Sequence, residues 1–451
     1  MSNFDVAAGI SNASVNQLCK DLFDNPAAKA NIFQDTLNEP VDTIGTVSLT
    51  YQLFAAPELL LEAPSDDLWT KSQKPKDAQK PTTNAFQISF PDVKGSASIN
   101  GGAPVAGEGL MTIIGELKTD NGTASLIADA IYIDEASFSK WDKKIVNALL
   151  IPSALTKANS MLSSLPIPAI PTFKDIEFQP VTIQVVNKQI VAGALLKTSQ
   201  DPIDLSGLNI TSDTGIDVLV NKTVVNTLFS TIASKDYSDE EKTGNDDWYA
   251  AGKVGTTLST LALQSDNSPI TVSAGTTNTT ASGEIGGVGV GVVKTVLCPI
   301  STAMDAAADP NNWNKIIASF NVSYKPSPIS ITIDPQIAEG KDDKGNAAKV
   351  ALISVEPVSS INVTASPSWS KSISGSILSA ASSALIDLIP KQLQTLIVDK
   401  IINAKLQNLQ LYVLPEYTKQ VEGVNITVQG TTGSIPLSNG LLSTSIGVSF
   451  N

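Results

Sequence analysis

The strongest constraint on the fold of this chain is an order of secondary-structure signals that occurs twice. In each half an apolar strand precedes a short amphipathic helix, several alternating strands, a long apolar helix and closing strands. The opening of the first half, Asp5-Val6 with Val15-Asn16-Gln17-Leu18, resembles Asp217-Val218 with Val225-Asn226-Thr227-Leu228 in the second. A repeat of two large units is too long for a solenoid, so the pattern predicts two similar domains packed together.

Two further matches support an internal duplication. Ser137-Phe138-Ser139-Lys140-Trp141 resembles Ser368-Trp369-Ser370-Lys371, and both stretches precede a long apolar helix. Near the end of each half, Val181-Thr182-Ile183 resembles Asn425-Ile426-Thr427. The spacing between matched positions grows along the chain, which is what insertions in surface loops produce.

Chain length also favours two domains, since 451 residues exceed what one hydrophobic core usually organises. We place the boundary near Leu205, which gives an N-terminal domain of residues 1–205 and a C-terminal domain of residues 206–451.

Alternation of apolar and polar residues predicts half-buried antiparallel strands in both halves. The clearest examples are Val47-Leu49-Tyr51-Leu53, Phe86-Ile88-Phe90, Val181-Ile183-Val185, Ile329-Ile331-Ile333 and Val424-Ile426-Val428. Helical spacing predicts short helices over Val15–Phe23, capped by Asn12 or Ser14, and from Lys222. It also predicts long helices over Trp141–Leu162, interrupted by Pro152, and over Ser370–Lys405, bent near Pro390.

Charge and composition exclude several classes of function. All 30 basic residues are Lys, against 44 acidic residues, and the net charge is −14. Nucleic-acid binding calls for clustered Lys and Arg, so we expect none. The absence of His removes His-dependent catalysis and His-ligated zinc. Cys19 and Cys298 match no metal or redox spacing, which leaves free thiols as the default and a single disulfide open.

The N-terminal sequence carries no basic region followed by an apolar run, and no window holds eighteen consecutive apolar residues. We therefore expect a soluble protein without stable membrane insertion, which is cytoplasmic or exported by a non-classical route.

The pattern resembles the tubular lipid-binding superfamily, which includes the bactericidal permeability-increasing protein. The likeness is carried by the opening Phe4-Asp5-Val6 strand running into Val15–Phe23, by the late long helix, and by the closing Val424-Asn425-Ile426-Thr427 with Asn439-Gly440-Leu441-Leu442. The pattern is also similar to bacterial members of this superfamily that are found beside some clostridial toxins. The resemblance implies an α+β rod of two tandem domains, each with a highly twisted antiparallel sheet wrapped around a long helix and enclosing an apolar tunnel.

On this basis we expect a non-enzymatic protein, without cofactor or metal, that carries, stores or transfers a lipid or another elongated apolar ligand. A protein partner encoded nearby is a further possibility. The residues expected to line the tunnel are apolar and lie on the helices: Leu18, Leu22, Ile145, Leu149, Leu155, Ile377, Leu385, Leu388 and Ile397. Taken singly, each is more readily explained by core packing, and only the set as a whole supports a cavity.

Two other interpretations of the function remain open. One is an interaction or toxin-accessory protein that has kept the fold but filled its tunnel. The other is a hydrolase that uses Ser, Lys and Asp, because Ser137-x-x-Lys140 and Ser368-x-x-Lys371 match the nucleophile motif of penicillin-recognising enzymes in part. Serine capping of the following helix explains both tetrads better, since the companion motifs are absent. The glycine-rich Gly286–Gly291 lacks dinucleotide spacing.

An acidic cluster follows the helix predicted from Lys222. Its residues are Asp236, Asp239, Glu240, Glu241, Asp246 and Asp247. It lacks the ligand register of an EF-hand loop, so we expect a solvated loop there and no calcium site.

Overall fold

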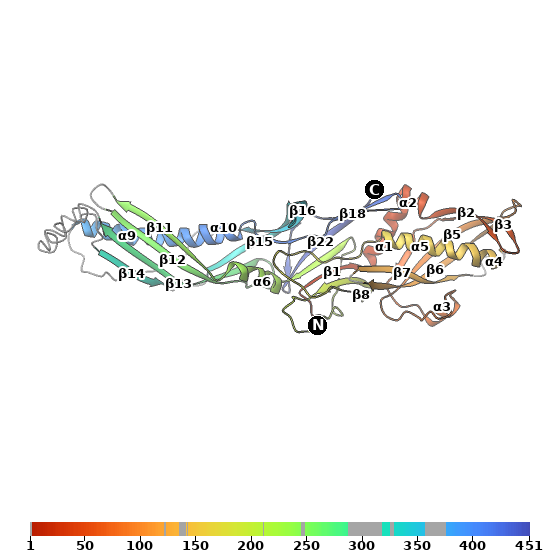
Figure 1. Ribbon diagram of the computed structural model, residues 1–451, viewed down its shortest axis with the longest axis horizontal. Coiled ribbons are helices and arrows are strands. Elements are labelled where there is room, and N and C mark those ends of the chain that lie inside the picture. Colours follow the sequence, from red (N-terminus) through yellow and green to blue (C-terminus); the bar gives the residue numbers. More distant parts are fainter. Residues whose placement is uncertain are drawn as a thin grey trace.

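The fold is seen in a computed structural model that describes residues 2–120, 123–134, 141, 143–210, 212–244, 249–286, 318–324, 329–356 and 376–451. The molecule is elongated, with both chain termini near its middle (Figure 1). Three antiparallel sheets follow one another along the long axis, and few helices accompany them. This confirms the expected class of curled antiparallel sheets with few helices.

The central sheet combines strands from both halves of the chain, in the order β18-β19-β22-β10-β1-β9-β8. The first half of the chain contributes β1 (Val6–Ser11), β8 (Thr182–Val186) and β9 (Gln189–Ala194). The second half of the chain contributes β10 (Ile216–Asn221), β18 (Tyr417–Val421), β19 (Val424–Gly430), β21 (Leu437–Ser438) and β22 (Leu441–Phe450). The short β21 pairs with β22. β1 and β10 lie side by side, with Val6 opposite Val220.

The N-terminal sheet has the order β2-β3-β5-β6-β7, with β4 on β5. Its strands are β2 (Gln34–Val41), β3 (Gly45–Leu53), β4 (Glu58–Leu60), β5 (Ala85–Ile99), β6 (Val105–Asp120) and β7 (Thr123–Ile133). The β5–β6 and β6–β7 ladders contain register shifts, which bend strands and increase their twist. The helices of this half are α1 (Asn12–Asp24), α2 (Pro26–Asn31), α3 (Asp66–Lys71), α4 (Lys143–Ile145), the π-helical η1 (Val146–Leu150) and α5 (Ile151–Ser164).

The C-terminal sheet has the order β11-β12-β13-β15-β16-β17, with β14 on β13 and β20 on β15. Its strands are β11 (Lys235–Gly244), β12 (Tyr249–Leu263), β13 (Ile270–Gly286), β14 (Ala318–Tyr324), β15 (Ile329–Lys341), β16 (Ala347–Val355), β17 (Gln410–Val413) and β20 (Gly433–Ser434). The helices are α6 (Lys222–Ile232), α9 (Ser376–Gln394), the π-helical η3 (Thr395–Asn403) and α10 (Ala404–Leu406).

The alternating segments form strands as the sequence predicts. Along β3, β15 and β19 the predicted apolar residues are buried or half-buried and their neighbours are more exposed. One continuous cluster of buried side chains takes members from all three sheets and from the long helices, including Val6, Phe86, Val218, Ile333 and Ile397. The core therefore does not stop at the end of either half.

The two short helices begin where central strands end. Ser11, the last residue of β1, caps α1 by accepting a hydrogen bond from Ser14 N–H at 3.0 Å. Asn221, the last residue of β10, caps α6 in the same way through Thr223 N–H. The predicted cap at Asn12 or Ser14 was therefore wrong. Asn12 already lies in the helix, and its Oδ1 accepts a hydrogen bond from Leu61 N–H.

Pro152 does not interrupt the first long helix, contrary to expectation. α4, η1 and α5 follow one another without a gap, and Pro152 comes two residues after the π-helical segment η1. A π-helical turn changes the hydrogen-bond pattern next to the proline, which is how the helix continues past a residue without an N–H. Pro390 likewise lies inside α9, which continues to Gln394.

Candidate functional site

The nine predicted tunnel residues lie on helices of both halves. Seven have described side chains, which are buried or half-buried in the core: Leu18, Leu22, Ile145, Leu149, Leu155, Leu388 and Ile397. Ile377 and Leu385 lie in α9, but their side chains fall outside the described residues. None of the seven borders either of the two hollows below, so their role as a ligand surface stays a prediction.

The first hollow, here called the α5 seam, lies between α5 and the N-terminal sheet. It is lined mainly by apolar side chains: Ile32, Phe33, Tyr51, Phe90, Met111 and Met161. Its cavity volume is only about 20 Å³, which accommodates about one water molecule. The seam is therefore nearly filled by side chains.

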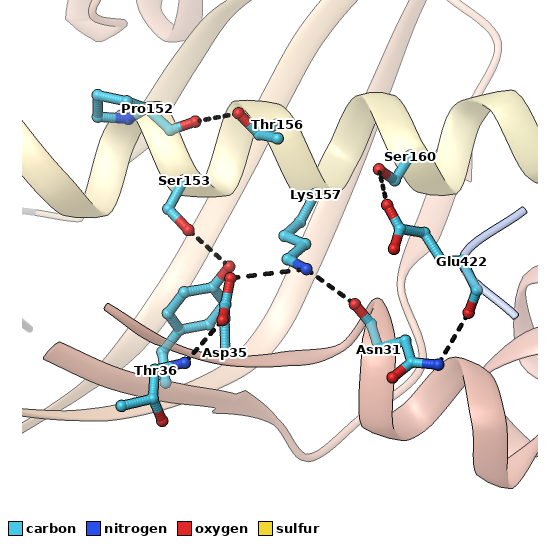
Figure 2. A network of polar contacts seen from close by, with 10 residues as sticks. Asn31, Asp35, Thr36, Pro152, Ser153, Thr156, Lys157, Ser160 and Glu422 are labelled. Carbon is cyan, nitrogen blue, oxygen red and sulfur yellow. Dashed lines mark hydrogen bonds and ion pairs between the residues drawn. The ribbon is translucent and has the colours of Figure 1, made fainter. Parts of the chain in front are cut away.

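A row of polar contacts covers the seam (Figure 2). Tyr51 Oη and Ser153 Oγ are 2.9 Å apart, and Lys157 Nζ donates to the Asn31 carbonyl oxygen at 2.8 Å. Lys157 also lies 3.5 Å from Asp35. Burial raises the pKa of Tyr51 to about 12, so the phenol stays neutral and can donate to Ser153. These contacts hold α5 against α2 and β2.

The second hollow, here called the α5 mouth, opens at the C-terminal end of the same helix. Its volume is about 350 Å³, within the range of small-molecule pockets. Its walls come from the end of α5 with the segment that follows, from β7, and from the β18–β19 hairpin. The apolar wall residues are Leu126, Leu162, Leu165, Ile167, Tyr417 and Ile426, and Lys419 brings one positive charge.

The local sequence explains why the mouth forms at this point. Leu165 ends α5 in an extended conformation, and Pro166 and Pro168 cannot continue a helix. Ile167 is therefore held between two prolines, half-buried, beside the hollow. Helical spacing had identified Leu162 as apolar helix surface but not as part of a site. The sequence signal that could have predicted the mouth is Ile167, an apolar residue between two prolines directly after a helix.

Lys419 connects the hairpin to the helix end. Its Nζ donates to the Ser163 carbonyl oxygen at 2.8 Å, so a free carbonyl of the last helical turn is satisfied by a cation, which the helix dipole favours. The mouth thus combines an apolar wall with one ammonium group at its edge.

The other sequence candidates give no second site in the described part of the chain. Both Ser-x-x-Lys tetrads lie outside the described residues, as do Cys298 and most of Gly286–Gly291. Cys19 is a buried free thiol whose pKa burial raises to about 12. The described residues contain no group of three or more Cys, Asp or Glu that could hold a metal ion, and no described helix is long and apolar enough to cross a membrane.

The acidic cluster corrects one expectation. Asp236, Asp239, Glu240 and Glu241 lie on β11, an edge strand of the C-terminal sheet, and not in a loop. Lys400 on η3 donates to Asp239 at 2.5 Å, so part of this charge is paired within the fold. Charged edge strands resist pairing with other chains.

Comparison with known proteins finds similarity only at the level of whole structures. No family model matches the chain, and no curated protein matches it. The crystal structure of P47 of Clostridium botulinum E1 shares 12% identity at a TM-score of 0.35, with 100% of both chains covered. A lipopolysaccharide binding protein shares 9% identity at a TM-score of 0.34, with 100% of this chain and 99% of that chain covered.

The structure of P47 from Clostridium botulinum A2 shares 11% identity at a TM-score of 0.31, covering 98% of this chain and 97% of that chain. At such TM-scores the similarity carries no conclusion about a ligand of this chain.

Proposed function

We propose that the protein binds the apolar part of a lipid, or another elongated apolar molecule, in the α5 mouth and does not change it chemically. The observation that carries this proposal is an open hollow of about 350 Å³ whose wall combines apolar side chains with a nearly equal polar surface, including a single cation. This combination suits a molecule with an apolar part and a polar end. Burying methylene groups contributes about 0.8 kcal/mol each, so eight would contribute about 6 kcal/mol before the cost of immobilising the ligand. No catalytic group is needed.

An elongated ligand requires the α5 seam to open. Met161 lines the seam and its neighbour Leu162 lines the mouth, so the two hollows border successive residues of one helix. Met111 and Met161 are unbranched and flexible, and such side chains yield to a ligand at small cost. A tail that enters at the mouth would extend along α5 by displacing them, and the two hollows together would then form the tunnel.

In the proposed arrangement the chain consists of two tandem domains of the tubular lipid-binding kind. Support comes from the central sheet, in which β1 with α1 and β10 with α6 occupy neighbouring, antiparallel positions. On their outer sides lie β9 with β8 and β22 with β19. This order is what a duplicated unit would produce.

A second candidate function is that of an interaction or accessory protein with a filled interior. The α5 seam favours it, because a volume of about 20 Å³ leaves no room for an acyl chain unless side chains move. The two candidates differ in one measurable property, which is whether the interior opens for a ligand.

Titration with cis-parinaric acid, whose fluorescence rises in apolar surroundings, tests the proposal. We expect saturable binding by the unmodified protein and at least tenfold weaker binding by Ile167→Asp, because the variant places a carboxylate in the mouth at a half-buried position. The control is Val181→Asp, a change at an apolar residue that is 38% exposed and lies outside both hollows. Equal affinity of both variants would remove the mouth as the site.

Native mass spectrometry of protein purified from its source gives an independent measurement. Co-purifying lipid in stoichiometric amounts is expected for the carrier. No bound lipid, together with no uptake of cis-parinaric acid, would support the accessory function instead.

A further inference from the structure

The β18–β19 hairpin stands at the edge of the central sheet. It consists of β18, a two-residue turn of Glu422 and Gly423, and β19. Both turn residues have positive φ, 49° and 82°, as in the tight turns that join paired strands. Among the described strands β18 pairs only with β19, and most of its side chains are exposed. The hairpin is therefore attached to its sheet along one side only.

One face of this hairpin closes the α5 mouth. Lys419 and Ile426 are directly opposite each other in the ladder and both line the hollow, as does Tyr417 two residues away. Residues opposite each other, or two apart on one strand, share a face of a sheet. Ile426 is only 2% exposed, whereas Tyr417 is 40% exposed. The buried side of the hairpin is thus the outer wall of the cavity.

Among the described residues, three polar contacts of Glu422 and Lys419 fasten the hairpin to the N-terminal half. Glu422 takes part in two of them: its carboxylate accepts from Ser160 Oγ at 3.3 Å, and its carbonyl oxygen accepts from Asn31 Nδ2 at 2.8 Å (Figure 2). The third is the bond from Lys419 to the Ser163 carbonyl oxygen. All three lie in exposed surroundings, where water replaces a broken hydrogen bond at little net cost.

We infer that the β18–β19 hairpin is a latched lid that controls entry to the α5 mouth and exit from it; this inference rests on the proposed function. When the contacts at Asn31, Ser160 and Ser163 break, β18 and the turn bend outward, while β19 stays paired with β22 and keeps Val424, Ile426 and Val428 in the core. This movement uncovers the apolar wall of the mouth. When the contacts re-form, Tyr417 and Lys419 close over the ligand. The latch then sets the rates of exchange, while the wall residues set the affinity.

A reversible cross-link across the latch tests this directly. Ser160→Cys and Glu422→Cys are combined with Cys298→Ser, and Cys19 is retained because its thiol is buried. The contact reaches Ser160 through the end of the long Glu422 side chain, so the two new thiols are joined by 1,2-ethanediyl bismethanethiosulfonate instead of a direct disulfide, and mass spectrometry verifies the link. Stopped-flow fluorescence with cis-parinaric acid measures uptake and release. We expect both rates to fall at least tenfold in the cross-linked protein and to recover on reduction. Equal rates in the cross-linked and reduced forms would overturn the lid and leave the binding site intact.

The opposite change provides a test that needs no disulfide. Asn31→Ala with Glu422→Ala removes two of the three latch contacts, and we expect release to become at least threefold faster, with circular dichroism unchanged. The matched control is Glu177→Ala, which breaks an exposed ion pair with Lys197 away from both hollows; its rates should equal those of the unmodified protein. Unchanged release from the latch variant would overturn the lid.

The tests separate failure of the lid from failure of the binding proposal. If the unmodified protein takes up no cis-parinaric acid, the proposed function fails and the lid with it. If the probe binds but neither latch variant changes a rate, only the lid fails.

Discussion

At the scale of single residues, the curled sheets depend on positions where no side chain fits. Gly115 lies at the register shift between β6 and β7. A Cβ atom there would lie 2.1 Å from the Ile127 carbonyl oxygen and 2.4 Å from Phe86 Cζ. Neither neighbour can retreat easily, since one is backbone and the other is a fully buried ring. Only glycine allows this close approach of two strands.

Gly115→Ala should therefore lower the free energy of unfolding by about 1 to 3 kcal/mol, the usual cost of overpacking. Urea denaturation followed by circular dichroism measures it. Gly255→Ala is the control, because Gly255 also borders a register shift but the nearest atom to an added Cβ would be 3.5 Å away. If both variants are equally stable, close packing does not explain the glycine at 115.

Residue patterns alone predict burial well but predict the candidate site poorly. Leu18 and Leu22 were expected to face apolar surroundings and do so, because helical periodicity reports which face is buried. Periodicity does not report whether that face meets side chains or empty space. The α5 mouth instead depends on Ile167, Tyr417 and Ile426, which meet only after residues far apart in sequence have packed together.

At the scale of elements, strand alternation and helical spacing locate most of the fold. The start of the first helix was displaced because its capping residue, Ser11, is also the last residue of a strand. The start of α6 at Lys222 was predicted correctly. The continuity of the helix through Pro152 was missed because residue spacing does not show the π-helical segment that precedes the proline. The pairing of β1 with β10 could not be predicted from either half by itself.

Asn221→Ala should destabilise the protein by about 1 kcal/mol, since α6 would lose the acceptor for Thr223 N–H. Asn221→Ser keeps a capping oxygen and should restore most of this difference. Thermal denaturation of the three proteins provides the comparison. An alanine variant as stable as the unmodified protein would show that α6 is held by packing alone.

At the scale of the whole molecule, the central sheet joins the two halves through hydrogen-bonded strands. β1 has a strand of its own half on one side and β10 of the other half on the other. The core cluster continues across this junction. Separating the halves would expose the long edges of β1 and β10 together with apolar side chains.

We therefore expect one unfolding transition in calorimetry, with a van't Hoff enthalpy close to the calorimetric enthalpy. Gly115→Ala, although it lies in the N-terminal sheet, should shift this entire transition to lower temperature and should not split it. Two resolved transitions, of which the variant moves only one, would show that the halves unfold independently.

The position of β1 also has a consequence for synthesis on the ribosome. All six residues of this strand are buried in the finished protein, yet its neighbours β9 and β10 are far downstream. At about 5 to 20 residues per second, translation reaches Gln189 roughly 10 to 40 s after Val6. For that time the nascent chain presents an apolar segment without its partners, so newly made protein should depend on a chaperone that shields its first strand.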